Sequence, residues 1–299
     1  MRPSPELELL QYLTPKNAEL AADNPVLLEE FAVKRGDVSF YLLVNRRHRN
    51  MRVLDYRIGS YQLKRATLDH LAKQRGLRKI YTLVEKQDSN SWRTVGFSRE
   101  AVVPAYFRTA DAYVMSRVYN EEGEPLTGGL SKVAVEHPVP EPKRPRKPSG
   151  LKLSLVTDPT KLAKLVVKPK KNPFYAPYGK GVLGPEVGVS ATVNRRRFWV
   201  VGEMNEAFGH AKVDVLGSPS SVREVYACVF AFHKLAEYFE DQNMAGVFAF
   251  VPVADELYNL LFASAGCRHT GQLTRHVVFE GGEPLDMHVW HYRIRPRGG

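Results

Sequence analysis

Apolar residues fall into two kinds of run along this chain, and the two kinds predict different elements. Residues 38–44 and 246–253 are short, almost wholly apolar runs, as expected for strands that are covered on both faces of a sheet. Residues 62–76 and 221–242 instead carry apolar side chains three or four positions apart, which predicts amphipathic helices. The chain therefore mixes strands and helices in the alternating manner of α/β proteins.

One arrangement of elements occurs twice. Residues 255–267 predict a helix that ends near Gly266, a position that favours a residue able to adopt positive φ. Two strand-like runs follow this helix, at 270–279 and 285–293. A shorter version of the same plan covers residues 92–115, with Gly96 at the end of its helix. We therefore expect two related units, each closing with a helix and a hairpin.

The remaining elements complete both units. The first half is predicted to contain short helices at 5–13, 24–31 and 89–95 and strands at 38–44, 51–58 and 79–84. The second half is predicted to contain strands at 151–156, 187–193, 198–204 and 211–216 and a short helix at 159–167. The predicted fold class is α/β, with tandem units whose mixed central sheets are flanked by helices. The second sheet should have six or seven strands.

A linker separates the two units. Residues 137–150 contain five prolines together with lysines and arginines, and such a segment has little to bury and favours an extended chain. We expect an abridged first domain at 1–136, the linker at 137–150 and a second domain at 151–299.

The net charge of +11 is concentrated in one part of the chain. Residues 141–180 carry +9 of it, so the rest of the chain is close to balanced. A basic run of this kind is typical of a solvated spacer, and it also attracts polyanions without sequence preference. The Arg-rich stretches 46–49 and 195–197 are expected to be solvated hairpin tips.

Cysteine usage and hydropathy bear on the compartment. Cys228 and Cys267 are the only cysteines, and both have apolar neighbours in sequence. Two thiols are too few for a disulfide framework and cannot form a structural zinc site without histidine ligands, so we expect reduced, buried thiols, no metal and a cytoplasmic protein. No apolar run reaches the roughly 18 residues that a membrane helix needs, and the first residues are not those of a signal peptide, so we expect no membrane association.

Several motifs, taken in order, resemble one family. In the first half they are Asn45-Arg46-Arg47, the run at 96–107 that begins Gly-Phe-Ser-Arg-Glu, and the run Asp-Ala-Tyr-Val-Met-Ser from Asp111. In the second half they are Tyr258-Asn259 with Phe262 and Gly266, Gly271-x-Leu273, and Met287-x-Val289-Trp290. Together they resemble the GNAT acyltransferase superfamily and, within it, the putative β-lysine N-acetyltransferases that accompany lysine 2,3-aminomutase. The resemblance implies tandem GNAT-like units and an acyl-CoA-dependent N-acyltransferase that acts on an amine.

The resemblance also implies a place for acetyl-CoA. In GNAT enzymes a glycine-containing loop before the long helix presents backbone amides to the coenzyme A pyrophosphate. Here Arg223 and Val225 stand where that loop has glycines, with Glu224 between them, so we expect weak binding. The candidate coenzyme-binding residues are Leu216, Ser218, Ser220, Ser221, Arg223 and Asn259. The same serines also form a good helix N-cap without any ligand.

Two carboxylates are the candidate catalytic groups. Glu203 and Asp214 lie on predicted central strands, where either could serve as a general base. The tyrosine that usually donates a proton in GNAT enzymes stands four residues before the glycine of the last helix. That position is Phe262 in the second half and Trp92 in the first, and neither side chain is a proton donor of this kind.

The candidate substrate residues follow from the same resemblance. The paired asparagines of the β-lysine family are matched here by Arg275 and His276, and the asparagine before its Val-Trp is matched by His288. Neighbouring residues on a strand point to opposite faces, so at most one of Arg275 and His276 can line a site.

Two functions from different classes remain open on the sequence alone. One is a GNAT-type N-acyltransferase. The other is a catalytically inactive GNAT-derived protein that binds a protein or nucleic acid through the basic residues at 141–180. Whether the two central strands of the second unit separate would distinguish them, because such enzymes admit the pantetheine arm between those strands.

Overall fold

The computed structural model describes residues 8–13, 28–57, 59–126, 135–166, 174–176, 178, 184–278 and 282–294. Its contacts divide the chain into two compact units, called unit 1 and unit 2 below. Unit 1 comprises Met1–Ala101, Ala112–Val135 and Leu273–Asp286, and unit 2 comprises Val102–Asp111, Glu136–Gln272 and Met287–Gly299. Each unit therefore includes a hairpin tip from the other half of the sequence.

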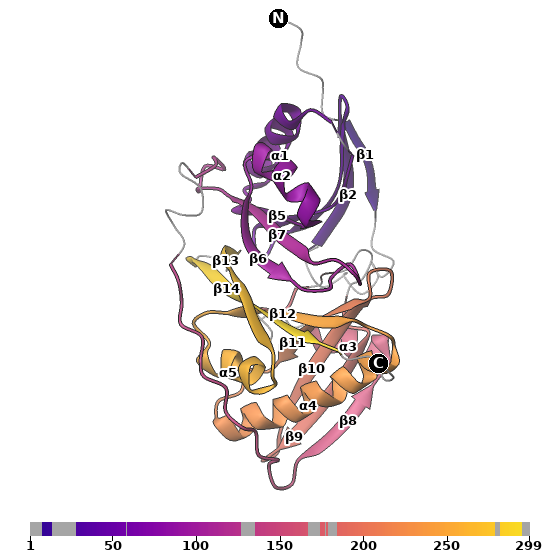
Figure 1. Cartoon of the computed structure of the whole chain (residues 1–299), viewed down its shortest axis with the longest axis vertical. Coiled ribbons are helices and arrows are strands. Elements are labelled where there is room, and N and C mark those ends of the chain that lie inside the picture. Colours follow the sequence, from indigo (N-terminus) through magenta and orange to yellow (C-terminus); the bar gives the residue numbers. More distant parts are fainter. Residues whose placement is uncertain are drawn as a thin grey trace, which may run out of the picture. The chain divides into compact units, whose positions relative to one another are not determined.

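Unit 1 is built on a mixed sheet, shown in indigo to magenta in Figure 1. Its strands are β1 (Glu8–Leu13), β2 (Leu28–Arg35), β3 (Val38–Asn45), β4 (Asn50–Tyr56), β5 (Lys79–Glu85), β6 (Ser98–Val103, of which unit 1 holds 98–101) and β7 (Ala112–Val118), in the spatial order β1-β2-β3-β4-β5-β7-β6. Helix α1 (Tyr61–Arg75) connects the parallel strands β4 and β5, and it ends at Gly76 in the left-handed conformation, with φ of 60°. The 3₁₀ turn η2 (Lys86–Asp88) and helix α2 (Ser89–Val95) lead into β6.

The described residues before Val38 form the strands β1 and β2, so the two short helices predicted at 5–13 and 24–31 are wrong for those residues. β1 pairs antiparallel with β2, and β2 pairs antiparallel with β3 along its whole length. In β2, buried Phe31 and Val33 alternate with partly exposed neighbours, which is the period of a strand. The helix prediction at 24–31 rested on local sequence, which gives no information about the neighbouring strand β3 that supplies these hydrogen bonds. Residues 5–7 and 24–27 of the predicted helices lie outside the described residues.

Unit 2 repeats the strand order of unit 1. Its strands are β8 (Lys152–Val156), β9 (Val187–Val193), β10 (Arg196–Asn205), β11 (His210–Leu216), β12 (Gly246–Pro252), β13 (Arg268–Val278, of which unit 2 holds 268–272) and β14 (Pro284–Arg293, of which it holds 287–293). They lie in the order β8-β9-β10-β11-β12-β14-β13, with β11 and β12 parallel. The helices are α3 (Pro159–Val166), α4 (Val222–Asp241) and α5 (Glu256–Ser264). The predicted fold class, two tandem α/β units with mixed sheets and flanking helices, is confirmed.

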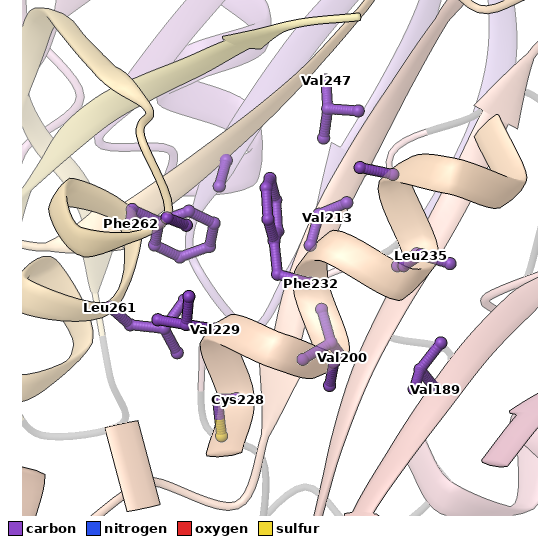
Figure 2. Packing of buried hydrophobic residues seen from close by; sticks show 14 of the residues in the cluster. Val189, Val200, Val213, Cys228, Val229, Phe232, Leu235, Val247, Leu261 and Phe262 are labelled. Atoms are coloured by element: carbon purple, nitrogen blue, oxygen red, sulfur yellow. The ribbon is translucent and has the colours of Figure 1, made fainter. Parts of the chain in front are cut away.

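Helix α4 forms the core of unit 2 with one face of the sheet. Phe232 lies between Val213 on β11 and Phe262 on α5, and all three are almost wholly buried (Figure 2). On β10, Gly202 leaves room for Phe239, because a Cβ at that position would lie 2.4 Å from the Phe239 ring. This packing fixes α4 against the parallel strands, so the start of α4 lies beside the end of β11.

The opposite face of the same sheet is covered by α3 and Tyr175. Leu162 of α3 packs with Val201, Leu216 and Tyr175. Polar side chains share this face with the apolar ones, and they form part of the site described below. None of the helices in the described part of the chain is long and apolar enough to cross a membrane.

The predicted domain boundaries stay a prediction, which limited proteolysis can check. Residues 137–150 have no helix or strand, and most of their side chains are exposed. We expect the first cut of the native protein between Pro138 and Gly150, because a protease needs an extended, accessible backbone. A first cut inside α4 or β12 would contradict the boundary.

Candidate functional site

The central strands of unit 2 separate after a short stretch of pairing. β11 and β12 pair only at His210–Gly246, Ala211–Val247 and Lys212–Phe248. Beyond Lys212, β11 continues to Leu216 with β10 as its partner, while β12 continues to Pro252 paired with β14. The two strands therefore separate toward their carboxyl ends, and this gap in the pairing of β11 with β12 is called the opening below.

Two consecutive residues of α5 bind the edges of this opening. The Val215 amide on β11 donates to the Tyr258 hydroxyl at 2.7 Å. The Asn259 side chain donates from Nδ2 to the Pro252 carbonyl on β12 at 2.8 Å and to the Asp255 carbonyl at 2.9 Å. The separated strands are thus held by side chains of the helix that follows β12.

Tyr258 is a candidate proton donor that the sequence interpretation missed. It lies one turn before Phe262 on α5, and its hydroxyl reaches the opening. Phe262 has no hydroxyl and cannot donate a proton there. Burial, with Asp214 as the next cause, raises the pKa of Tyr258 well above its ordinary value, so the phenol stays protonated at neutral pH. Within the described part of the chain, the hydroxyl accepts from Val215 and has no acceptor for its own hydrogen. The sequence does place a tyrosine one helical turn before Phe262. Its role could be recognised only once β11 and β12 were seen to separate beside it.

Asn259 is fully engaged within the fold. Its Oδ1 accepts from Trp290 Nε1 at 2.9 Å and lies 2.8 Å from His288 Nδ1. Because an amide oxygen can only accept, His288 carries its hydrogen on Nδ1. Asn259 and His288 therefore lie together, as candidate coenzyme and substrate residues respectively, but both are buried and hydrogen-bonded to one another.

The start of α4 already holds an anion, which is a carboxylate of this chain. Ser221 caps the helix by accepting from the Glu224 amide. The Glu224 carboxylate is buried and accepts from the Ser220 amide at 2.7 Å and the Ser220 hydroxyl at 3.0 Å. Arg196 of β10 donates to both Glu224 carboxylate oxygens, at 2.7 and 2.8 Å. Glu224 thus takes the place that an anionic ligand would take at a helix N-terminus.

The other predicted coenzyme residues near the start of α4 have contacts of their own. Ser218 is exposed, and its carbonyl accepts from Arg196 at 3.4 Å. Leu216 is buried against α3 at the end of β11. Arg223 is exposed and donates to the Ser149 carbonyl at 3.0 Å. Arg196 is therefore the arginine at this position, and the sequence interpretation had placed it in a solvated turn.

Glu203 lies on the face of the sheet opposite to α4. Its carboxylate accepts from the Tyr175 hydroxyl at 3.0 Å and from the Tyr178 amide at 2.7 Å. Both tyrosines belong to residues 174–176 and 178, called the covering segment below, and Glu203 is only 4% exposed. The carboxylate that we predicted as a base therefore binds the covering segment.

Asp214 is the second predicted base and lies on the separated part of β11. Lys212 donates to its carboxylate, and the same ammonium donates to the Ala176 carbonyl at 3.2 Å. Burial raises the pKa of Asp214, and Lys212 opposes that rise. A carboxyl group with a raised pKa is a better proton acceptor in the neutral range than an ordinary aspartate.

The remaining candidate substrate residues belong to unit 1. His276 is buried with its ring edge-on to Tyr81, and its carbonyl accepts from Asn50 at 2.8 Å. Arg275 is in the left-handed conformation, with φ of 51°, and its amide donates to Asp286. Both residues therefore make packing or hydrogen-bond contacts within unit 1. The substrate role predicted for them stays a prediction.

Unit 1 repeats the separated strands of unit 2. β4 and β5 pair from Asn50–Lys79 to Val53–Thr82 and no further. At the start of α1, the Ser60 amide donates to the Asp37 carboxylate at 2.9 Å. A carboxylate of the chain therefore lies at the start of the helix in both units.

Metal and thiol chemistry have little support among the described residues. No group of three or more His, Cys, Asp or Glu in that part of the chain could hold a metal ion. Cys228 and Cys267 are both free, and burial raises the pKa of Cys228 to about 12. Burial also raises the pKa of Cys267, so neither thiol is activated as a nucleophile.

No family model and no curated protein matches this chain. It is similar to several solved acetyltransferases. They include the ribosomal-protein-S18-alanine N-acetyltransferase of Escherichia coli, at 12% identity and a TM-score of 0.38, over 49% of this chain and 97% of that one. A putative acetyltransferase of Salmonella typhimurium, solved with acetyl-CoA, has 10% identity and a TM-score of 0.38, over 50% and 98%. The spermidine N-acetyltransferase of Vibrio cholerae, in complex with CoA and spermine, has 14% identity and a TM-score of 0.37, over 49% and 96%. Identity this low carries no information about substrate.

Proposed function

We propose that unit 2 is an acyl-CoA-dependent N-acyltransferase of the GNAT type that binds its coenzyme weakly. The observation that carries the proposal is the opening between β11 and β12, with the Tyr258 hydroxyl bound to the Val215 amide at its edge. A thioester that entered this opening would meet the protonated Tyr258 phenol, whose oxygen is held by the Val215 amide. The order of the motifs in the sequence also supports an amine acceptor of the β-lysine kind.

In acyl transfer from coenzyme A to an amine, the coenzyme supplies the acyl group in activated form, as a thioester. The amine nitrogen forms the new bond to the carbonyl carbon, and the C–S bond breaks. Asp214, whose pKa is raised by burial, accepts the proton that the amine loses. Tyr258 donates its proton to the departing sulfur, and the Val215 amide, which donates to the Tyr258 hydroxyl, stabilises the negative charge left on the phenol oxygen. Glu203 orders the covering segment next to the acceptor.

The start of α4 would hold the coenzyme pyrophosphate, but Glu224 competes for that position. Ser220, Ser221 and Arg196 are suited to an anion, and they already bind the Glu224 carboxylate. A phosphate must displace this carboxylate and then remains close to its negative charge. Both effects make the free energy of coenzyme binding less favourable.

Calorimetric titration of the full-length protein with acetyl-CoA tests the proposal. We expect a dissociation constant above about 100 μM, corresponding to roughly −5.5 kcal/mol or less favourable. Heat that saturates in the millimolar range would support the proposal. The absence of any heat at millimolar acetyl-CoA would contradict it.

A second candidate function is non-catalytic binding of a polyanion through the linker. The observation that favours it is that Lys143, Arg144, Arg146 and Lys147 are all exposed. The basic residues at 168–171 and 180 lie outside the described residues. We expect weak, sequence-independent binding of DNA or RNA that falls steeply with salt, and that weakens when these four residues are replaced by Ser. Tight binding that survives high salt would contradict this expectation.

We also propose a cytoplasmic location. The two free, buried thiols support it, because a reducing compartment keeps cysteines in this state.

A further inference from the structure

The segment Val102–Asp111 connects β6 to β7 in the first half of the sequence. Its contacts nevertheless place it in unit 2. It is internally tied: the Ala105 amide donates to Asp111 at 2.9 Å and the Phe107 amide donates to the Ala110 carbonyl at 3.0 Å. Ala105 and Arg108 adopt positive φ values of 51° and 64°. Such conformations cost energy and persist where the surroundings fix them, so this turn is held in one shape.

Tyr106 of this segment is embedded among unit 2 residues. It is 1% exposed, and its ring stacks on His210 of β11 with centroids 3.7 Å apart. Its carbonyl accepts from His210 Nδ1 at 3.0 Å. In the same segment, Arg108 donates to the Glu206 carbonyl at 2.8 Å, and Gly209 leaves space for the Arg108 side chain.

The Tyr106 hydroxyl continues this contact toward the candidate base. It lies 3.1 Å from the Tyr178 hydroxyl, and both side chains are buried. The Tyr178 amide in turn donates to the Glu203 carboxylate at 2.7 Å. A chain of two hydrogen bonds therefore runs from the segment at 102–111 through Tyr178 to Glu203.

We infer that Tyr106 is a positioning residue for the acceptor side of unit 2: it holds Tyr178, and through it the covering segment, on Glu203. The site of unit 2 is therefore incomplete without a segment from the first half of the sequence. The role of Glu203 beside the acceptor rests on the proposed acyl transfer, whereas the linkage of Tyr106, Tyr178 and Glu203 does not.

Amide hydrogen exchange on the full-length protein tests the linkage. Tyr106→Phe removes the hydroxyl and keeps the ring, so we expect the Tyr178 amide to exchange about fivefold faster, the effect of one hydrogen bond. The Val215 amide, which donates to Tyr258 of α5, should exchange at its original rate. Tyr119→Phe is the matched control, because it removes a buried hydroxyl that donates to Asp69 within unit 1. It should leave the Tyr178 amide unchanged.

A double-mutant cycle protects the test against a general loss of stability. Tyr178→Phe should accelerate exchange of the same amide by a similar factor, and the double variant should be no faster than either single variant. Unchanged exchange in Tyr106→Phe, or additive effects in the double variant, would overturn the inference. Because the readout needs no coenzyme or acceptor, failure of the acyl transfer proposal would leave this result untouched.

Discussion

Replacing Lys79 by Met is expected to lower the free energy of unfolding by about 3–5 kcal/mol, because it leaves a buried carboxylate without its partner. Lys79 is 0% exposed, and its ammonium lies 2.6 Å from Glu100 Oε2. Glu100 is also buried, and it further accepts from the Ser116 hydroxyl at 2.6 Å and the Thr274 amide at 2.7 Å. Lys79 donates to the Thr274 carbonyl as well, so the pair fixes the hairpin tip within unit 1.

Urea denaturation measures this effect, and two variants control it. Lys73→Met removes an exposed lysine 3.9 Å from Glu124 and should change the free energy of unfolding by less than about 0.5 kcal/mol. The double variant Lys79→Met with Glu100→Leu should recover most of the loss, since apolar replacement of both partners avoids the unpaired charge. A loss below about 1 kcal/mol for Lys79→Met would show that the pair does not stabilise unit 1.

Replacing Tyr258 by Phe is expected to reduce acyl transfer about 100-fold, the lower end of the contribution of a general acid. The variant keeps the ring in the core but removes both the proton for the departing sulfur and the acceptor of the Val215 amide. Release of free coenzyme A thiol from acetyl-CoA, measured with a panel of primary amines, reports the rate. A Tyr258→Phe rate equal to that of the original protein would remove Tyr258 from the mechanism.

Tyr226→Phe is the control for this second prediction. Tyr226 lies on α4, is partly exposed, and packs at the margin of the same core. Loss of its hydroxyl should leave the rate within about twofold, because surface changes away from the site have small effects.

Much of the fold could be predicted because it is encoded locally. The apolar run of β12 and the helical spacing of α4 predicted these elements directly, and the glycine after α1 predicted its end. The N-terminal strands were missed because β2 is defined by its pairing with β3, which no local propensity reveals.

The candidate site was less predictable, since its contacts join distant residues. Arg196 and Glu224 are 28 positions apart, and sequence alone placed the arginine in a solvated turn. Tyr258 could be recognised only once β11 and β12 were seen to separate beside it. The membership of residues 102–111 in unit 2 likewise depends on contacts with residues more than 70 positions away.

The affinity of acetyl-CoA for the Glu224→Ser variant, compared with the original full-length protein, tests the central claim most directly. The claim is that the start of α4 and the opening beside it form the coenzyme site, in which the Glu224 carboxylate competes with the pyrophosphate. Removing that carboxylate frees Arg196 and the Ser220 amide, so calorimetry should give a dissociation constant at least about tenfold lower, a gain of about 1.4 kcal/mol. Glu237→Ser, an identical change at an exposed position of α4, should leave the affinity unchanged. An affinity that is unchanged or weakened in Glu224→Ser would contradict the account.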